Sequence, residues 1–576
     1  MTALHSLNLF TNPLVVKCAR ERLRMKNTLS WGLVVIVLAA FIYAISWKSA
    51  ERYLGDYRAD MDHATLAAKF ALAALVLMQG VILLLIGTGS VASGVAQERM
   101  GRVLDYQRMT PMSPMSKIVG YLFGLPIREY FMVGLTMPIV VYAAVQAQVK
   151  LSNLLQLYLV GFVSVWLYHM TGMVAGMVSA KPWRASMITQ GMVVLMYFIM
   201  PQLASVGFTF FLYLTPRPVF ARLASDELGL NWGGIVNRED WQESVYFFDA
   251  AIHPTLFTLL VQGFLLIAMF VIVYRKWRED SQHAFTKAFA VIFFAGAQTL
   301  LVGSLWPWLT KTALLRSRNM RNLFDDFGAG RDGAGVLIVL LYIFFFVSLS
   351  VILLLVNMIT PSRYTYAKGI RRSKKKSLSR VPWLSDAASA MPYSIIFIIL
   401  TCISYFVLLR LAEKGGTFHL MVPSTGSMVL LSVWFAALVI YVQAVRQLWG
   451  MRGLFMALFL LWIVPFLTYV LMHAAKSPPL SAAYVSTPVP LMALGFAVGN
   501  LYEPLMHNID PSGVAASVSN LTLVAAAINV VLAVVSLALL WRRQTMTKIT
   551  ELARFLPPPV PEPELERVPE PVEVRV

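Results

Sequence analysis

The sequence predicts an all-α integral membrane protein, a polytopic bundle of about twelve transmembrane helices with both termini in the cytoplasm. Two observations lead to this fold class. Of the 576 residues, 58% are apolar and only 13% are charged, whereas globular chains average roughly 45–50% and 25%. The apolar residues also form blocks of about 18–25 residues, long enough to cross a hydrocarbon core as helices, in which the backbone hydrogen-bonds internally.

The apolar blocks place the expected spans in chain order. The first six lie at roughly 30–47, 68–96, 127–148, 154–180, 187–214 and 254–274. The second six lie at roughly 288–308, 334–359, 392–410, 427–446, 453–474 and 519–541. The chain then divides into an N-terminal interfacial segment over 1–29, a six-span domain over 30–280, a second six-span domain over 281–555 and a tail over 556–576. The tail is rich in Pro and Glu and should be a disordered cytoplasmic extension.

Lysine and arginine set the orientation of the spans. They gather in the N-terminal segment and after the second, fourth, sixth and eighth spans, most densely over 368–380. That side should be the cytoplasmic side of a bacterial inner membrane. The basic run over 368–380 could there contact either anionic lipid or an ATPase. The net charge of +19 then reflects these loops and not nucleic-acid binding, for which no motif is present. The segment 309–333 departs from the rule, because it should be external and yet is basic.

The two sets of six spans share the positions of prolines and basic turns, which suggests two six-helix repeats. Each fifth span contains a proline, Pro201 or Pro465, and each fourth and fifth span are joined by a short basic turn, at 181–184 and 446–452. Parallel repeats are a recurrent design in transporters. Residue-level similarity between the halves is poor, so the second half is either a repeat or an unrelated membrane domain.

Motifs for catalysis or nucleotide binding are absent from the sequence. There is no G-x-x-x-x-G-K-[ST] loop and no H-E-x-x-H pair. The two cysteines, Cys18 and Cys402, exclude a disulfide framework and a four-cysteine metal site. We therefore expect no enzymatic activity, no cofactor and no metal in this chain.

Polar residues within the spans are mostly amides, which we expect to bridge helices. They are Gln190, Gln262, Gln298, Asn357 and Asn529. His169 stands alone in the fourth span and should be packed and hydrogen-bonded. Carboxylates are missing from the span centres, where ion-coupled carriers bind their ion, so the energy for transport should come from a partner that hydrolyses ATP.

The N-terminal segment predicts a short basic helix. In Thr11-Asn12-Pro13 a capping residue precedes a proline at the first helical position. A helix over about 13–27 would place Lys17, Arg20 and Arg24 on one face. It would lie in the cytoplasmic membrane interface, unless the segment is only a basic flank that obeys the orientation rule.

The loop after the second span predicts a second short helix. This loop begins with Glu98, Arg99, Gly101 and Arg102 and continues with Thr110-Pro111, Ser113-Pro114 and Lys117. Ser113-Pro114 again indicates a cap and a first turn, so a helix near 114–121 should project into the cytoplasm. A rigid projection of this kind is what mechanical contact with an ATPase requires.

With these motifs, residues of about 8–280 resemble the permease subunits of type-2 ABC exporters. In that family the N-terminal helix is a connecting helix, and the loop after the second span docks on a nucleotide-binding subunit. The resemblance implies a partner pair of ATP-binding subunits that bring ATP and Mg, and an external gate within 215–253. It assigns Asn12, Pro13, Lys17, Arg20 and Arg24 to the connecting helix, and Glu98, Arg99, Gly101, Arg102, Thr110, Pro111, Ser113 and Lys117 to the ATPase contact.

The resemblance has two departures. Arg102 follows Gly101, where the family usually has threonine. The family also usually ends after six spans, so the second half is a fused permease or an added domain. Substrate identity stays open among lipid, polysaccharide, peptide and drug.

Two other functions remain alternatives. One is a twelve-span secondary transporter, since Gly94, Glu98, Arg99 and Gly101 also resemble the loop motif of the major facilitator group. That group, however, has a tight turn here and a long connection between halves, where this chain has a short one at 275–287. The other is a membrane-embedded enzyme acting on lipid-linked substrates through external acids, namely Asp226, Glu227, Glu239, Asp240, Glu243 and Asp249.

Overall fold

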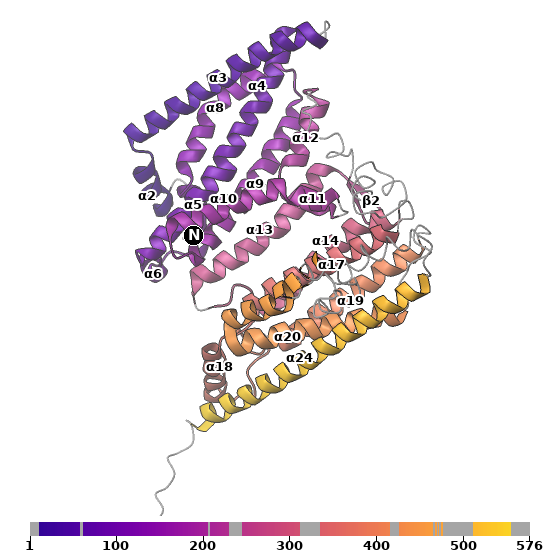
Figure 1. Ribbon diagram of the computed structural model, residues 1–576. Coiled ribbons are helices and arrows are strands. Elements are labelled where there is room, and N and C mark those ends of the chain that lie inside the picture. Colours follow the sequence, from indigo (N-terminus) through magenta and orange to yellow (C-terminus); the bar gives the residue numbers. More distant parts are fainter. Residues whose placement is uncertain are drawn as a thin grey trace, which may run out of the picture.

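Long helices packed side by side make up nearly all of the described chain (Figure 1). The computed structural model describes residues 11–57, 62–205, 208–229, 245–280, 282–310, 334–414, 425–464, 467–468, 471, 474–475 and 511–553. Within these residues nine helices are long and apolar enough to cross a membrane, or ten if the bent pair Phe344–Ile359 and Arg363–Lys375 is one span. The all-α polytopic membrane fold is confirmed, and the count of twelve spans remains a prediction.

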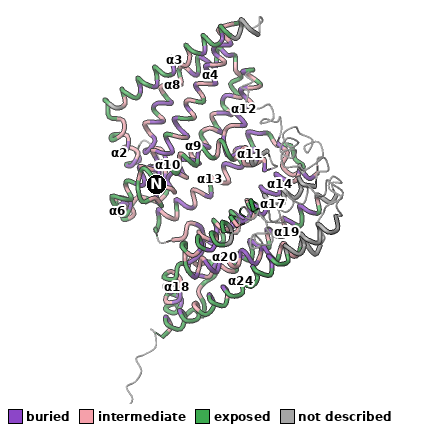
Figure 2. The backbone as a smooth tube through the Cα atoms, in the orientation of Figure 1, coloured by how far each residue is buried: buried purple, intermediate pink, exposed green. Residues whose placement is uncertain are grey.

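The first half begins with a short helix that turns into the first span. Helix α2 (Pro13–Arg22) is followed by α3 (Met25–Tyr57) and α4 (His63–Gly80), which continues through the π-helix η1 (Val81–Gly87) into α5 (Thr88–Met100). The helix expected over about 13–27 therefore ends early, and Arg24 lies outside it, just before α3. Most side chains of α3 are exposed (Figure 2), as lipid-facing residues should be.

The loop after α5 folds into two short helices before the third span. They are α6 (Val103–Met109) and α7 (Pro114–Gly124), followed by α8 (Ile127–Gln146), α9 (Leu151–Val178) and α10 (Pro182–Phe198). The short basic turn expected at 181–184 is present between α9 and α10.

The predicted fifth span over 187–214 is wrong as a continuous helix. Helix α10 ends at Phe198 and is followed by α11 (Met200–Ser205) and the 3-10 helix η2 (Thr209–Leu214). Pro201 explains the break, because proline lacks the N–H of an intrahelical bond and its ring clashes with the preceding turn. Beyond it lie α12 (Arg217–Asp226), a hairpin of β1 (Val245–Phe247) and β2 (Ala250–Ile252), and α13 (Pro254–Arg278).

The second half holds fewer but longer described helices. They are α14 (Lys287–Thr310), α17 (Ala334–Ile359), α18 (Arg363–Lys375), α19 (Met391–Lys414), α20 (Thr425–Leu458), the π-helix η3 (Phe459–Ile463) and α24 (Pro511–Ala553). Helix α18 is bent by 54° from the helix before it. The basic turn expected at 446–452 is a sharp kink within α20, at Gly450 with φ 72°. The segments 311–333 and 476–510 and the tail 556–576 lie outside the described residues.

The largest core cluster joins the two halves. Phe208, Ala268 and Ile272 of the first half are buried together with Phe294 and Phe345 of the second. Two amides link helices as predicted: the buried Gln298 donates to Ser348 Oγ at 3.0 Å, and the half-buried Asn357 accepts from Arg446 at 2.9 Å.

Three other polar predictions have different outcomes. His169 is fully buried and hydrogen-bonded, as expected, with its Nε2 3.1 Å from the Leu83 carbonyl in η1 and its Nδ1 3.2 Å from the Tyr130 hydroxyl. The bridging role expected of Gln262 is wrong, because its side-chain amide is fully buried without a hydrogen-bond partner. Asn529 donates within its own helix, to the Ala525 carbonyl.

One end of the bundle carries the short helices that concern function. Helices α2, α6 and α18 lie at this end, and α12 and the hairpin lie at the other (Figure 1). We call it the basic end, because it carries the Lys- and Arg-rich segments around α2, α6 and α18.

Candidate functional site

The two sequence-predicted helix starts at the basic end are both confirmed and are joined to each other. Asn12 caps α2 by accepting from the Leu14 N–H at 3.0 Å, and Ser113 caps α7 by accepting from the Ser116 N–H at 3.1 Å. The Asn12 side chain also donates to the Ser116 carbonyl at 2.8 Å. A residue that caps one helix therefore also ties it to the first turn of the other.

Helix α2 packs against α7 through two glycines. A Cβ on Gly120 would lie 2.7 Å from Leu14 Cβ, and a Cβ on Gly124 would lie 3.1 Å from Cys18 Cβ. Since residues four apart share a helix face, Gly120 and Gly124 form a flat strip that receives Leu14 and Cys18. The sequence analysis missed this contact, although the Gly-x-x-x-Gly spacing was a usable signal.

Glu98 lies at the centre of a polar network beneath α6. Its Oε1 is 3.1 Å from Lys17 Nζ on α2, and its Oε2 accepts the hydroxyl of Tyr121 on α7. Tyr121 OH is also 2.6 Å from the side-chain amide of Gln107 on α6. Helices α2 and α7 thus meet at one carboxylate at the end of α5, and α6 joins them through Tyr121.

Burial and charge shift the pKa values of this network. Burial alone would lower the pKa of Lys17, but the hydrogen bond and charge of Glu98 outweigh it, so this pKa lies above its usual 10.5. Burial, followed by the charge of Glu98, raises the pKa of the Tyr121 hydroxyl. The tyrosine therefore stays protonated and donates, while Lys17 stays charged at neutral pH.

Helix α6 is held firmly on its inner side. Lys117 is buried and donates to the Gln107 carbonyl at 2.5 Å, and Leu104 is buried in the cluster that contains Tyr121 and Trp277. Arg108 binds Asp105 at 2.7 Å and reaches α13, where it donates to the Lys276 carbonyl at 3.2 Å. The helix is therefore a fixed projection rather than a loose loop.

The outer face of α6 carries exposed apolar side chains next to the exposed Asp105. Tyr106 is 68% exposed and Met109 is 78% exposed, and Met100 and Met115 flank them as further exposed apolar side chains. Gly101 and Arg102 are exposed at the turn that starts α6, where Arg102 has φ 58°. Exposed apolar residues on a fixed projection, away from the apolar spans, are typical of a protein contact surface.

This arrangement corrects the expectation that α7 would project into the cytoplasm. Helix α7 is largely buried, and the exposed projection is α6. Lys117, assigned above to the ATPase contact, points inward because it satisfies a backbone carbonyl of α6. Thr110 is also partly committed, since its hydroxyl donates to that same carbonyl at 2.6 Å.

The remaining predicted residues occupy the rim of this surface. Pro111 and Ser113 are exposed in the turn between α6 and α7, and Arg99 donates to the Ser179 carbonyl at 3.3 Å. On α2, Pro13 and Arg20 are exposed and Asn12 is buried, so this helix is bound to the protein along one side. Arg22 strengthens that binding, because it donates to the Leu125 carbonyl at 2.5 Å.

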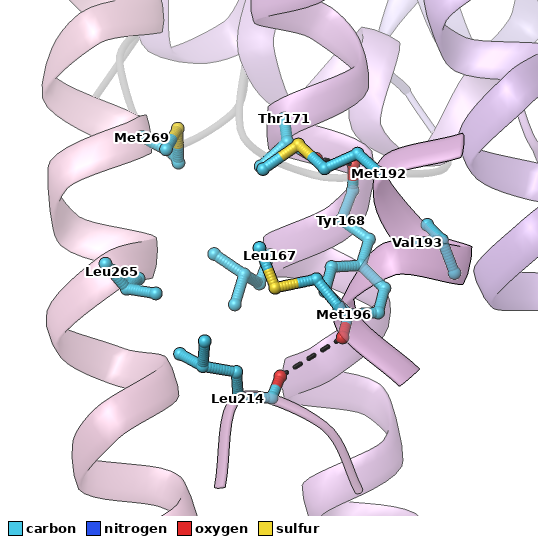
Figure 3. Close-up of a pocket in the computed structure, with 9 residues that line it drawn as sticks. All are labelled: Leu167, Tyr168, Thr171, Met192, Val193, Met196, Leu214, Leu265 and Met269. Carbon is cyan, nitrogen blue, oxygen red and sulfur yellow. Dashed lines mark hydrogen bonds between the residues drawn. The ribbon is translucent and has the colours of Figure 1, made fainter. Parts of the chain in front are cut away.

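A small closed cavity lies deeper in the first half, between α9, α10, η2 and α13 (Figure 3). Its volume is about 40 Å³, and its lining is almost wholly apolar, including Leu167, Met192 and Met269. Both hydroxyls of the lining already donate to backbone carbonyls, Tyr168 to Leu214 at 3.1 Å and Thr171 to Tyr168 at 2.7 Å. A space of this size holds little more than water, so it does not accommodate a substrate in this conformation.

Acidic residues at the opposite end have structural partners where they are described. Glu227 accepts from Asn153 at 2.6 Å, Asp226 pairs with Arg222 at 3.4 Å, and Asp249 accepts from Trp306 at 3.1 Å. Glu239, Asp240 and Glu243 lie outside the described residues. No group of three or more metal-ligating side chains occurs within the described part of the chain.

Comparison with known proteins gives no relative for this chain. It matches no family model, no curated protein and no solved structure.

Proposed function

We propose that this chain is the membrane-spanning permease subunit of an ATP-driven ABC exporter, located in a bacterial inner membrane. It would act with a separate pair of ATP-binding subunits, which bind the ATP and Mg. The basic end faces the cytoplasm, in keeping with the concentration of Lys and Arg there. The observation that carries the proposal is the exposed apolar face of α6 on a firmly held base.

The base gives α6 the mechanical property that coupling needs. A push on Tyr106 or Met109 is transmitted to α13 through Arg108 and to α2 and α5 through the Glu98 network. The Arg108 contact is partly buried and the Tyr121–Gln107 contact is buried, so a shift of α6 would also move the helices that it contacts.

The buried charges favour an external energy source. Among the described residues, Glu129 and Lys287 are fully buried, and both lie at the first turns of their helices, α8 and α14. Glu129 also pairs with Arg128 at 2.8 Å. Ion-coupled carriers place such groups along the ion path inside the membrane, which supports a partner ATPase over a secondary carrier.

The test is the ATP hydrolysis that copurifies with the full chain from its native host in mild detergent. Tyr106→Glu combined with Met109→Glu should reduce it at least tenfold, because central apolar contacts of an interface are worth about 2 kcal/mol or more. Tyr364→Glu is the matched control, since Tyr364 is 69% exposed on α18 and should leave the activity unchanged. Wild-type chain without associated ATP hydrolysis, or an unaffected double variant, would refute the proposal.

A further inference from the structure

A second cavity opens at the basic end of the second half. It has a volume of about 460 Å³ and lies between α18, the segment 376–390, the start of α19 and the last turns of α24. It is more than ten times larger than the apolar cavity of the first half, whose volume is about 40 Å³. Unlike that cavity, it has charged groups in its lining.

The lining carries three cations and no acid. Lys374 of α18, Arg380 of the following segment and Lys548 of α24 all line the cavity, and its lining contains no Asp or Glu. Within the described residues none of these three cations takes part in an ion pair, whereas the neighbouring Arg371 is paired with Glu551 at 2.9 Å. Three unpaired cations around one space favour an anion.

The walls of the cavity are held in place. Arg371 and Glu551 fix α18 to α24, and Tyr393 donates to the Trp383 carbonyl at 3.1 Å. Asp386 binds Arg275 at 2.7 Å, which ties the segment that carries Arg380 to α13. Ser379 and Ser389 also line the space and offer hydroxyl donors. Cations on walls that are held in place, with added hydroxyl donors, suit a phosphate group.

The surroundings of the cavity point to a lipid as the source of that phosphate. Trp383 is 71% exposed beside it, and tryptophan prefers the interface of a membrane. Pro392 lines the cavity at the start of the apolar helix Met391–Leu411. On the same side of that helix, Ile395, Ile399 and Ile403 are exposed one turn after another. An acyl chain can lie on this stripe while its headgroup occupies the cavity.

We infer that this cavity binds the phosphate headgroup of an anionic phospholipid, with Lys374, Arg380 and Lys548 as its cationic ligands. The inference is independent of the ATPase partner, because it uses residues of the second half alone. It gives the second half a role as a lipid-anchored support for the first. Basic pockets between helices near the cytoplasmic leaflet are known binding sites for such headgroups.

The experiment is native mass spectrometry of the full chain with phosphatidylglycerol or with phosphatidylcholine of the same acyl chains. Wild type should retain phosphatidylglycerol preferentially. Joint replacement of Lys374, Arg380 and Lys548 by Gln should weaken this binding of the order of 100-fold, since each cation near an anionic lipid is worth about fivefold. Arg372, Lys375 and Lys376 line no part of the cavity, so their joint replacement by Gln is the charge-matched control and should change binding little.

Three results would overturn the inference. They are equal retention of the two lipids, equal loss in the cavity variant and the charge-matched control, and displacement of phosphatidylglycerol by an equal concentration of glycerol phosphate, which has no acyl chains. Lys548→Gln alone should weaken binding about fivefold, so a measurement remains if the triple variant does not fold.

Discussion

The first and second halves use charge in opposite ways at the basic end. In the first half Glu98, Lys117 and Arg108 near α6 each bind a partner, and the outer face of α6 exposes Tyr106 and Met109. In the second half α18 is cationic on its exposed side, and three cations surround an open cavity. An apolar outer face suits a protein partner, and an unpaired cationic cavity suits an anion, so the halves are built for different contacts.

Within the described residues an ion pair links the two regions. Arg275 at the end of α13 binds Asp386 at 2.7 Å, and the same carboxylate accepts the His283 N–H at 3.1 Å. Because α13 also receives Arg108 from α6, a continuous line of contacts runs from the proposed ATPase surface to the proposed lipid site.

The largest expected effect comes from the close packing of α2 on α7. Gly120→Ala places a Cβ 2.7 Å from Leu14 Cβ and should destabilise the chain by about 1–3 kcal/mol through overpacking. Gly134→Ala is the control, because a Cβ there meets nothing within 4 Å, and its better helix propensity should leave the melting temperature unchanged or higher. Thermal unfolding in detergent checks both, and equal effects would remove the packing argument.

The second effect concerns the connection between the regions. Asp386→Asn leaves Arg275, whose side chain is 17% exposed, without its carboxylate and should cost about 1–3 kcal/mol. Asp280→Asn is the comparison, since the Asp280 side chain is 67% exposed in its pair with Arg108 and should cost less than about 1 kcal/mol. Equal melting temperatures for the two variants would mean that the Arg275–Asp386 pair does not hold the halves together.

A smaller effect distinguishes the half-buried ion pair of Lys17 and Glu98 from an exposed ion pair. A double-mutant cycle with Lys17→Met and Glu98→Gln should give a coupling of about 0.5–1 kcal/mol, because the Glu98 side chain is only 16% exposed. The pair of Lys48 and Glu51, at 79% and 61% exposure, should give a coupling near zero in the same cycle. Thermal unfolding of the four chains of each cycle provides the values. A coupling in the first pair no larger than in the second would contradict the network.

The smallest effect is a pH dependence at the connection. Burial lowers the pKa of His283 below its usual 6.5. The unfolded chain therefore takes up a proton more readily than the folded chain, so stability present above pH 6.5 is lost as the pH falls below it. The melting temperature of wild type should fall more between pH 7.5 and pH 5.5 than that of His283→Gln. Identical falls would show that His283 does not contribute.

Local signals in the sequence predicted where two of the short helices begin. The starts of α2 and α7 follow from Asn12-Pro13 and Ser113-Pro114, because capping is decided within a few residues. What the sequence did not reveal is which short helix is exposed. That depends on contacts such as Asn12 to Ser116, which are 104 positions apart, and on the glycine strip that lets α2 cover α7. The residue pattern within one segment carries no information on which distant residues that segment will contact.

Long apolar blocks predicted most spans for the same reason, and the failures occur where a single residue overrides the block. Pro201 ends α10, although the residues around it are apolar. At Gly450, with φ 72°, the turn between two helices is so short that they form one kinked element, α20. In both cases the apolar residues predict a segment within the membrane, and the backbone conformation of one residue decides where the helix breaks or bends.

The π-helix Val81–Gly87 has a consequence for how α5 meets its partners. A residue advances an α-helix by about 100°, and a π-turn takes in one residue more than an α-turn. The side chains of α5 are therefore rotated about the helix axis relative to the positions that a continuous α-helix from α4 would give them. In this arrangement Gln79 of α4 donates to Thr136 at 2.8 Å, and Glu98 of α5 lies 3.1 Å from Lys17. Rewinding this turn to α geometry would rotate α5 about its own axis and carry Glu98 out from between Lys17 and Tyr121.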